Sequence, residues 1–373
     1  MEKLSCFAVV IPGLEKIVEI ELNALSAHDV QATEAGVSFC GSMDTLCRVN
    51  LRARTVTRVL VRLADFKALS FPELYNKSYK IAWERYIPAG IEVQVRAACH
   101  HSRLIHSGRV EKAVQDAIAA RLSNSGSPAA PGTGDVQQIT VRLENDHCTI
   151  SIDSSGERLD RRGYRLQSGR APIRETVAAS ILQWMHWDIA EPLLVPMCGS
   201  GTFAIEAATM GLGRAVNLRH EFSFLHWPML HNKRWVRLME KAAGMEKSVL
   251  LAIEATDIDP DILQQAISNA EAAGVKDAIH FSQRDVRDLS ESGPSTDKGL
   301  IVCNPPYGDR LKGDVTALYK YLGGLLQGAL KGWRMAVIVP DKACESALGL
   351  PAKRRLKVKH GGKWVQVLHL ELD

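Results

Sequence analysis

The residues Leu300–Gly308 read LIVCNPPYG, and they decide how the second half of the chain is interpreted. An apolar run typical of a buried strand ends here in an amide, two prolines, an aromatic ring and a glycine. Proline nitrogens cannot donate hydrogen bonds, so the neighbouring carbonyls and the Asn304 side chain are free to accept from a ligand. Acceptors beside the Tyr307 ring suit a planar base that carries an amino group. The alternative is an ordinary strand that ends in a Pro-Pro turn.

Strand and helix patterns alternate regularly around this stretch. Helices are expected at 172–187 and from 202, 260 and 314, and strands at 193–197, 250–256, 278–282, 299–303 and 335–339. Such alternation predicts a parallel sheet with helices on both faces. Residues 357–360 and 364–372 flank Gly361-Gly362 and predict a β-hairpin, which adds antiparallel edge strands to that sheet.

The first 155 residues predict two smaller α/β units. Residues 6–66 show the order β-α-β-β-α-β, which is typical of a ferredoxin-like unit. A second unit is expected from helices at 71–82 and 108–122 and strands at 91–97, 138–143 and 148–154. The polar, basic and glycine-flanked residues 156–165 are interpreted as a linker. We therefore expect a ferredoxin-like unit at 1–66, a second unit at 67–155, a linker at 156–170 and a large α/β domain at 171–373.

Composition narrows the functional classes. The 373 residues are 46% hydrophobic and 24% charged, as is ordinary for a soluble globular protein. We expect a cytoplasmic protein without a membrane partner, because the sequence has no eighteen-residue apolar run and its start lacks a signal-peptide pattern. The eight cysteines form no Cys-x-x-Cys pair and are interpreted as reduced. No metal site is expected, even at Cys99-His100-His101.

Basic residues are clustered although the net charge is only +4. Clusters of this kind suit a polyanion such as RNA or DNA, whereas a single charge run is more often a solvated face. Three clusters favour nucleic acid. They comprise Arg48, Arg52, Arg54, Arg58 and Arg62; Arg158, Arg161, Arg162, Arg165, Arg170 and Arg174; and Lys353, Arg354, Arg355, Lys357 and Lys359.

Polar residues follow four successive strands of the predicted parallel sheet. The sequence Pro196–Thr202 forms a glycine loop that opens a helix, where backbone N–H groups are free to bind polar atoms. Its spacing also fits a dinucleotide fingerprint, but the next suitable acid, Asp257, lies 257 − 201 = 56 residues beyond Gly201 instead of about twenty. Asp285 and Asn304 end the next two strands. Open α/β sheets bind ligands at this edge, and Asp257 suits ribose hydroxyls while Asp285 suits an adenine amino group.

Taken together, these motifs resemble those of a known class of enzymes. The residues 196–202 (PMCGSGT), 256–260 (TDIDP), 285–286 (DV) and 304–307 (NPPY) resemble class I S-adenosylmethionine-dependent methyltransferases that act on exocyclic amino groups. More narrowly, the residues 154–157, 162–165, 171–175 and 213–227 resemble the THUMP-domain RNA methyltransferases of the large-subunit ribosomal RNA guanine-N2 type.

The resemblance implies a Rossmann-like C-terminal methyltransferase domain after ferredoxin-like and THUMP units. It also implies S-adenosylmethionine as the cofactor and RNA as the partner, with ribosomal RNA ahead of transfer RNA. The catalytic residues that it implies are Asn304, Pro305, Pro306 and Tyr307. The cofactor-binding residues are Pro196, Cys198, Gly199, Ser200, Gly201, Thr202, Asp257, Ile258, Asp285, Val286 and Asn304. The expected RNA-binding residues are Arg103, Arg161, Arg162, Arg165 and Arg174.

One position departs from the family pattern. The family usually begins its glycine loop with aspartate, which helps orient the charged end of the cofactor, whereas this chain has Val195. A non-catalytic RNA-binding protein is therefore a second hypothesis. Within the enzyme class, guanine in transfer RNA, adenine N6 in RNA or DNA, and a protein glutamine are alternative substrates, because Asn-Pro-Pro-Tyr serves several planar amines and amides.

Overall fold

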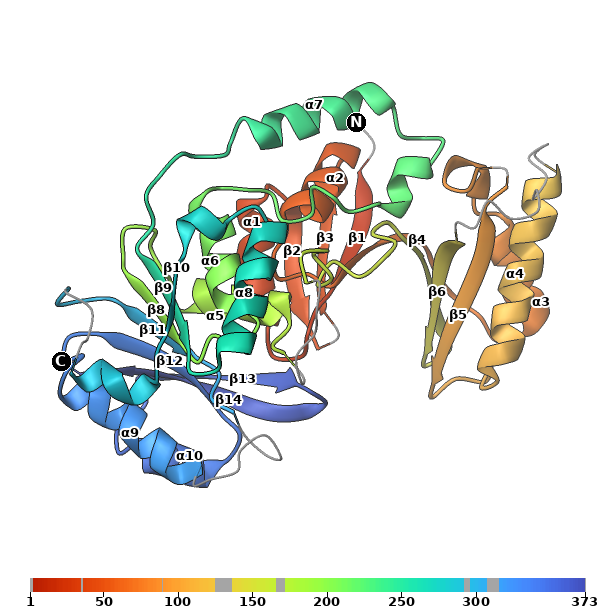
Figure 1. Ribbon diagram of the computed structural model, residues 1–373. Helices are drawn as coiled ribbons and strands as arrows, with labels where there is room; N and C mark the ends of the chain where they lie inside the picture. The colour runs from red at the N-terminus through yellow and green to blue at the C-terminus, as the bar shows by residue number, and fades with distance from the viewer. Residues whose placement is uncertain are drawn as a thin grey trace. The chain divides into compact units, whose positions relative to one another are not determined.

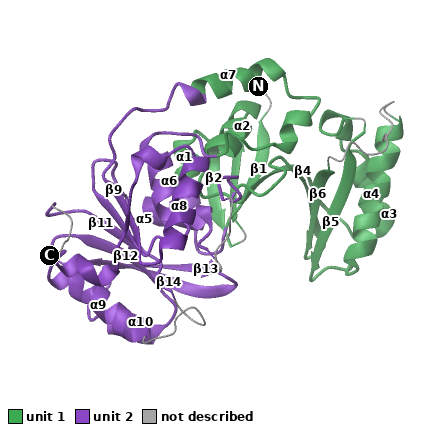
Figure 2. Cartoon of the chain, viewed as in Figure 1, with its two compact units in different colours: residues 1–10, 19–159, 217–241 green, residues 11–18, 160–216, 242–373 purple. Residues whose placement is uncertain are grey.

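The computed structural model describes residues 3–34, 36–88, 90–124, 136–165, 172–291, 296–306 and 315–372. The chain forms two compact units, which Figure 2 distinguishes by colour. Unit 1 comprises residues 1–10, 19–159 and 217–241, and unit 2 comprises residues 11–18, 160–216 and 242–373. The division differs from the expected one, because residues 217–241 lie inside the range expected for the methyltransferase domain and yet belong to unit 1.

Unit 1 is built on one seven-stranded sheet with the order β2-β3-β1-β4-β7-β6-β5 (Figure 1). The expected ferredoxin-like and second units therefore share a sheet. The strand that joins them is β4, which pairs with β1 along one edge and with β7 along the other. The strands are β1 (Leu4–Val9), β2 (His28–Thr33), β3 (Gly36–Gly41), β4 (Arg58–Lys67), β5 (Glu92–His100), β6 (Val136–Glu144) and β7 (His147–Asp153).

The helices of unit 1 begin at side-chain caps that the sequence supplies. Ser42 accepts a hydrogen bond from the Thr45 N–H at the start of α2, and Ser70 does the same for Glu73 at the start of α3. The helical elements are α1 (Glu15–Ala24, whose first residues belong to unit 2), α2 (Met43–Arg52), α3 (Phe71–Tyr79), η1 (Trp83–Arg85), α4 (Ser107–Asn124), η2 (Ser223–His226) and α7 (Asn232–Ala243, whose end belongs to unit 2).

Buried polar contacts hold residues 217–241 in unit 1. Asn217 Nδ2 donates to the Asn50 carbonyl at 2.7 Å, and Trp227 Nε1 donates to Gln137 Oε1 at 2.8 Å. Asn50 Oδ1 in turn accepts from Ser155 Oγ at 2.7 Å. All of these groups are buried, so removing one partner of a hydrogen bond would leave the other with a desolvation cost. The contacts explain why this segment belongs to unit 1 although it is distant from it in sequence.

Unit 2 contains the second seven-stranded sheet, with the order β10-β9-β8-β11-β12-β14-β13. The first five strands are parallel, and β14 pairs antiparallel with both β12 and β13. This arrangement confirms the predicted parallel sheet and its terminal hairpin. The strands are β8 (Leu193–Pro196), β9 (Ile253–Asp257), β10 (His280–Gln283), β11 (Leu300–Cys303), β12 (Arg334–Val339), β13 (Arg354–His360) and β14 (Lys363–Glu371).

Helices cover both faces of this sheet, as the regular alternation predicted (Figure 1). One face packs against α5, α6 and α8 through a core that includes Val177, Phe203 and Leu263. The other packs against α9 and α10 through Tyr319 and Cys344. The helical elements are α5 (Glu175–Trp184), α6 (Thr202–Gly211), α8 (Pro260–Ala272), η3 (Lys276–Ala278), η4 (Val286–Ser290), α9 (Val315–Gln327) and α10 (Lys342–Ala347).

Among the described residues, no helix is both long enough and apolar enough to cross a membrane. In the same residues, no group of three or more histidine, cysteine, aspartate or glutamate side chains is arranged to hold a metal ion.

Candidate active site

The loop between β8 and α6 has the left-handed backbone that its glycines permit. Gly199 has a φ of +57° and Gly201 a φ of +79°, and Gly201 is the N-cap residue of α6. A Cβ at Gly201 would lie 3.1 Å from the Cβ of Ala266 in α8. A Cβ at Gly199 would meet no atom within 4 Å. Gly201 is therefore needed for packing, whereas Gly199 leaves open space beside the loop.

Asp257 is fixed against this loop. It ends β9 and is 8% exposed, and its Oδ2 accepts a hydrogen bond from the Gly199 N–H at 2.9 Å. Its Oδ1 accepts from the Asp259 N–H at 3.1 Å. A carboxylate oxygen can accept more than one hydrogen bond, so lone pairs remain for the hydroxyls of a ribose. Ile258, the next residue, is 55% exposed at the same strand end.

Asp285 lies after β10 and is already paired. Its Oδ1 accepts from the Arg287 N–H at 2.9 Å, and its carboxylate forms an ion pair with the Arg287 guanidinium. The hydrogen bond from the Arg287 side chain lowers the pKa of Asp285 below its ordinary value. The carboxylate is therefore charged at neutral pH, as a hydrogen-bond acceptor for an amino group should be. Val286 follows it and is buried in the core beneath α9.

Asn304 follows β11 and carries an unused acceptor. Its Oδ1 is buried and, among the described residues, has no hydrogen-bond partner. Buried acceptors are nearly always paired, so this oxygen is able to accept a hydrogen bond from a ligand or a water molecule. Pro305 is buried and Pro306 is half-buried, and neither can donate a backbone hydrogen bond. Tyr307, the fourth residue of the motif, lies outside the described residues, and its stacking role stays a prediction.

The sheet order brings these groups to one edge. The strands β10, β9, β8 and β11 are neighbours and run parallel, so the residues that follow them lie along the same carboxyl edge (Figure 1). The glycine loop and Asp257 are joined directly, and Asn304 follows the strand on the other side of β8. An open backbone loop, a fixed carboxylate and a free amide oxygen fit an adenosine-containing cofactor beside an amino-bearing substrate.

A buried ion-pair network beneath the loop was not predicted from the sequence. Arg162 Nε lies 3.6 Å from Glu206 Oε1, with side chains that are 1% and 0% exposed. Arg165 Nη2 lies 3.1 Å from Glu175 Oε1 and donates to Thr202 Oγ1, at the start of α6, at 3.0 Å. The signal that could have revealed the network is Glu206 itself, because a charged residue within the apolar helix TFAIEAATMG must have a buried partner.

The same contacts involve two of the expected RNA-binding residues. The guanidinium groups of Arg162 and Arg165 pair with carboxylates inside unit 2, and their contact with RNA stays a prediction. Arg174 is half-exposed and lies 3.9 Å from Asp160. Arg161 is exposed. The sequence shows where charge is concentrated but does not show how deeply each side chain lies.

Burial changes the protonation of this network. Glu175 is 5% exposed, and burial raises its pKa to about 7, although the neighbouring Arg165 opposes the shift. Burial also raises the pKa of Tyr164, whose hydroxyl lies 3.4 Å from Glu206 Oε1 and donates to it. Because Arg165 connects Glu175 to Thr202, the charge on Glu175 acts on the start of α6 and on the glycine loop.

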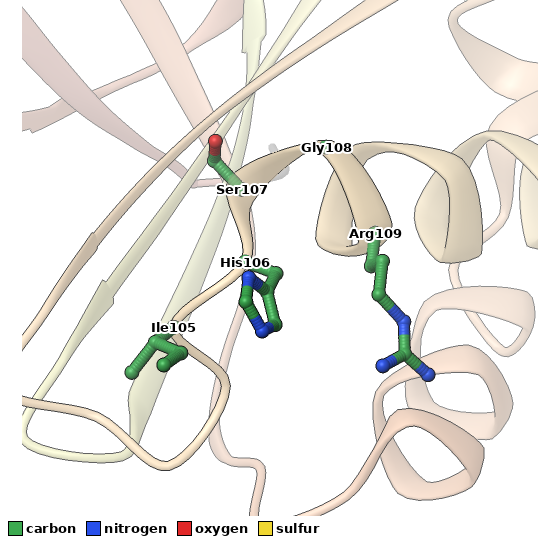
Figure 3. Close-up of a pocket in the computed structure, with 5 residues that line it drawn as sticks. All are labelled: Ile105, His106, Ser107, Gly108 and Arg109. Carbon is green, nitrogen blue, oxygen red and sulfur yellow. The ribbon is translucent and has the colours of Figure 1, made fainter.

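Arg103, the expected RNA-binding residue of unit 1, is exposed beside a surface concavity. Its side chain is 70% exposed and lies 3.7 Å from Asp146. The concavity has a volume of about 540 Å³ and lies at the start of α4, where Figure 3 shows its lining residues, Ile105, His106, Ser107, Gly108 and Arg109. Arg109 packs its guanidinium over the Phe71 ring at 4.3 Å. Cationic groups at this end of α4 are compatible with a polyanion.

Three protein families match consecutive parts of the chain. The RlmL ferredoxin-like domain matches residues 5–60, the THUMP domain residues 68–153 and the RMKL-like methyltransferase domain residues 162–366. Two curated relatives match nearly the full length. "Putative RNA methyltransferase slr0064" from Synechocystis is 34% identical and covers 98% of this chain and 96% of its own. "Putative RNA methyltransferase YpsC" from Bacillus subtilis is 34% identical and covers 97% and 94%.

Solved structures have the same architecture. A "putative methyltransferase complexed with SAH", SMU.472, is 29% identical with a TM-score of 0.91, and it covers 100% of this chain and 99% of its own. A "predicted N6-adenine-specific DNA methylase" from Listeria monocytogenes is 31% identical with a TM-score of 0.90 and covers 99% and 96%. TrmN from Thermus thermophilus shares the fold, with a TM-score of 0.73 at 20% identity and coverage of 99% of both chains.

Fold and site together define a class I methyltransferase that uses S-adenosylmethionine and carries ferredoxin-like and THUMP regions. The chain belongs to the RMKL-like methyltransferase family, whose domain matches 55% of its length (205 of 373 residues).

Proposed function

We propose that the protein methylates RNA on the exocyclic N2 of a guanine, most directly in 23S ribosomal RNA, and that Asn304 holds the amino group. The observation that carries this proposal is Asn304 Oδ1 after β11, which is buried and accepts no hydrogen bond from any residue that the structure describes. An exocyclic NH2 can supply a donor to this amide oxygen. The adjacent glycine loop and Asp257 support a cofactor on the neighbouring strands.

The chemistry requires alignment more than acid-base catalysis. S-adenosylmethionine, when bound, supplies an electrophilic methyl group on a sulfonium whose sulfur leaves as a neutral thioether. Asn304 Oδ1 and the Pro305 carbonyl accept hydrogen bonds from the guanine amino group and orient its lone pair toward the methyl carbon. The amino group held by these acceptors would take up the methyl group and release one proton to solvent. Tyr307 is proposed to stack on the base.

The proposed cofactor residues divide between two strand ends and the loop. Pro196 to Thr202 surround the methionine portion, where Gly199 leaves room for a ligand. Asp257 and Ile258 are assigned to the ribose, and Asp285 and Val286 to the adenine. Both carboxylates are held in place by hydrogen bonds, Asp257 to the glycine loop and Asp285 to Arg287.

RNA as the substrate is supported by the THUMP region and by the two relatives described as RNA methyltransferases. The proposal of guanine N2 is supported by the RlmL-type order of the three matched families. Adenine N6 is the competing target, because the Listeria structure is described as a "predicted N6-adenine-specific DNA methylase" and the same amide oxygen could accept from either amine.

The substrate can be tested with isotope-labelled S-adenosylmethionine and RNA from cells that lack the gene. Ribosomal and transfer RNA fractions are incubated separately with the full chain, digested and analysed by nucleoside mass spectrometry. We expect the label in N2-methylguanosine from the 23S fraction. Label in N6-methyladenosine would overturn the assignment of the base, and label confined to transfer RNA would overturn the assignment of the RNA.

A non-catalytic role has one observation in its favour. Val195, at the position of the family's aspartate, is 1% exposed and packs in the core of unit 2, so it provides no charge to the cofactor. Calorimetry distinguishes an active enzyme from a non-catalytic RNA-binding protein, because a methyltransferase must bind S-adenosylmethionine. We expect saturable binding of the cofactor that is weakened by Asp257→Ala. Absence of binding at millimolar cofactor would favour the non-catalytic role.

A further inference from the structure

The C-terminal hairpin carries the last basic cluster of the sequence, which neither the cofactor site nor the base site uses. Arg355, Lys357 and Lys359 alternate along β13, so their side chains share one face of the sheet, and all three are exposed. The register pairs Lys359 with Trp364 of β14 and therefore adds an aromatic ring to that face. We call Lys357, Lys359 and Trp364 the hairpin surface.

The ring of Trp364 is unusually open for its size. It is 49% exposed, and the Lys357 Nζ lies 4.9 Å from its centroid. A cavity of about 150 Å³, lined in part by Val339, Pro340 and Gln366, lies against the two residues. Tryptophan side chains are highly buried on average, so a ring with half its surface in water offers an aromatic face to a ligand. A flat ring next to ammonium groups suits a ligand that combines planar rings with negative charge.

The charges on this surface are available. The acidic side chains that line the cavity are engaged elsewhere, since Asp341 Oδ1 accepts from the Cys344 N–H at 2.9 Å and Glu345 pairs with Arg355 at 2.7 Å. Within the described part of the chain, no ion pair involves Lys357 or Lys359. Two unpaired ammonium groups therefore flank the ring.

The hairpin surface lies at the same sheet edge as the base site. The register aligns Cys303 with Val337 and Val337 with Leu368, so residues after Cys303 are level with the start of β14. The strands β11 and β14 are separated only by β12, which corresponds to a lateral distance of roughly 10 Å. A nucleic acid strand with one base at Asn304 therefore has its neighbouring nucleotides within reach of Trp364.

We propose that the hairpin surface binds the single-stranded RNA that flanks the target nucleotide. Trp364 stacks on one base, and Lys357 and Lys359 contact phosphates. Stacking on a single ring does not read sequence, so the surface contributes affinity and position instead of base specificity. The inference rests on the proposed function for the class of its ligand, and it assigns to unit 2 an RNA contact outside the catalytic motif.

Binding by the full chain tests this proposal, with an oligoadenylate as single-stranded RNA and heparin as a polyanion without bases. Trp364→Ala should weaken oligoadenylate binding roughly tenfold and leave heparin binding unchanged. Trp364→Phe, which keeps a ring, should retain most of the affinity. Lys357→Ala combined with Lys359→Ala should weaken the binding of both ligands. It should also lower the log-log slope of RNA binding against salt by about 1.4, since each phosphate contact on a single strand contributes about 0.7.

Lys331→Ala is the matched control, because Lys331 is an exposed lysine before β12, at the opposite sheet edge. It should change neither ligand. Unchanged cofactor binding shows that each variant is folded. The proposal is overturned if Trp364→Ala binds oligoadenylate like the wild type. It is also overturned if the lysine variants lose affinity for heparin but not for oligoadenylate, which is the result expected of a site for an acidic protein. A different result would contradict the proposed function: the wild-type enzyme would bind RNA but form no N2-methylguanosine.

Discussion

Gly199 and Gly201 both have positive φ, but a side chain at each position would meet different surroundings. Alanine at either position strains the backbone by about 1 kcal/mol. At Gly201 the new Cβ also presses on Ala266 at 3.1 Å, so we expect Gly201→Ala to lower the free energy of unfolding by about 2 kcal/mol.

Gly199→Ala is the matched comparison. Its Cβ meets no protein atom, so it should cost less stability and instead weaken S-adenosylmethionine binding. Denaturant unfolding and calorimetry of both variants measure the two effects. Equal stability loss in the two variants would contradict the different roles of the glycines.

Glu175 gives the stability of the protein a pH dependence. Its pKa is about 7 in the folded protein, above the ordinary 4.5, so the folded state binds the proton more tightly than the unfolded state. Its contribution to stability is therefore fully present below pH 4.5 and is lost as the pH rises to about 7, by up to about 3 kcal/mol. Glu175→Gln removes this titration.

Chemical denaturation at several pH values checks that expectation. The variant should gain stability relative to the wild type as the pH rises from 5 to 8, because the wild type must then bury a charge. Arg165→Lys serves as a control, since it keeps both the carboxyl group and the positive charge. A difference between wild type and Glu175→Gln that does not change with pH would contradict the raised pKa.

Single residues differ in how well the sequence predicts them. Asp257 and Asn304 were predicted as site residues because each ends a strand, and strand ends of a parallel sheet meet at one edge. The inward direction of Arg162 and Arg165 could not be predicted, because it depends on Glu206 and Glu175 in helices that are distant in sequence. The role of Tyr307 stays a prediction.

At the scale of elements, the start of α8 supports the cofactor site. Asp259 caps this helix by accepting from the N–H groups of Asp261 and Ile262, at 2.9 and 3.2 Å. Its own N–H donates to Asp257. We expect Asp259→Ala to lower stability by about 1 kcal/mol and to raise the KM for S-adenosylmethionine, because the helix start would fray.

Asp259→Asn is the control for this cap, since asparagine caps helices equally well. It should keep both stability and KM near the wild-type values. Thermal unfolding and steady-state kinetics measure the pair. If both variants lost cofactor affinity equally, the carboxylate charge of Asp259, and not its cap, would be the cause.

The strands and hairpin of unit 2 were predicted because their signals are local. Each apolar run lies next to turn residues, such as Gly361-Gly362 between β13 and β14. The single sheet of unit 1 was not predicted, because which edge of β4 meets β7 depends on residues that are far apart in sequence. The position of residues 217–241 in unit 1 could not be predicted for the same reason, because it depends on contacts with the distant residues Asn50 and Gln137.

At the scale of the whole molecule, β4 links the two halves of unit 1. Val61 is paired with Cys6 of β1 and Ile152 of β7. Its N–H can donate to only one of these strands, so proline at this position would remove one ladder hydrogen bond and distort the strand that both ladders share. Hydrogen exchange should show that Val61→Pro loses protection in β1 and β7 together. Val61→Ala keeps the backbone N–H and should retain protection in both strands. Loss confined to one strand would mean that the two halves unfold independently.

The central claim is that Asn304 holds the amino group that accepts the methyl group. The most direct test is the single-turnover rate of methyl transfer by Asn304→Ala with saturating S-adenosylmethionine and RNA. We expect a rate lower by roughly 100-fold or more, with RNA and cofactor affinities close to the wild type, because the lost acceptor acts on the reacting amine. An undiminished single-turnover rate would contradict it.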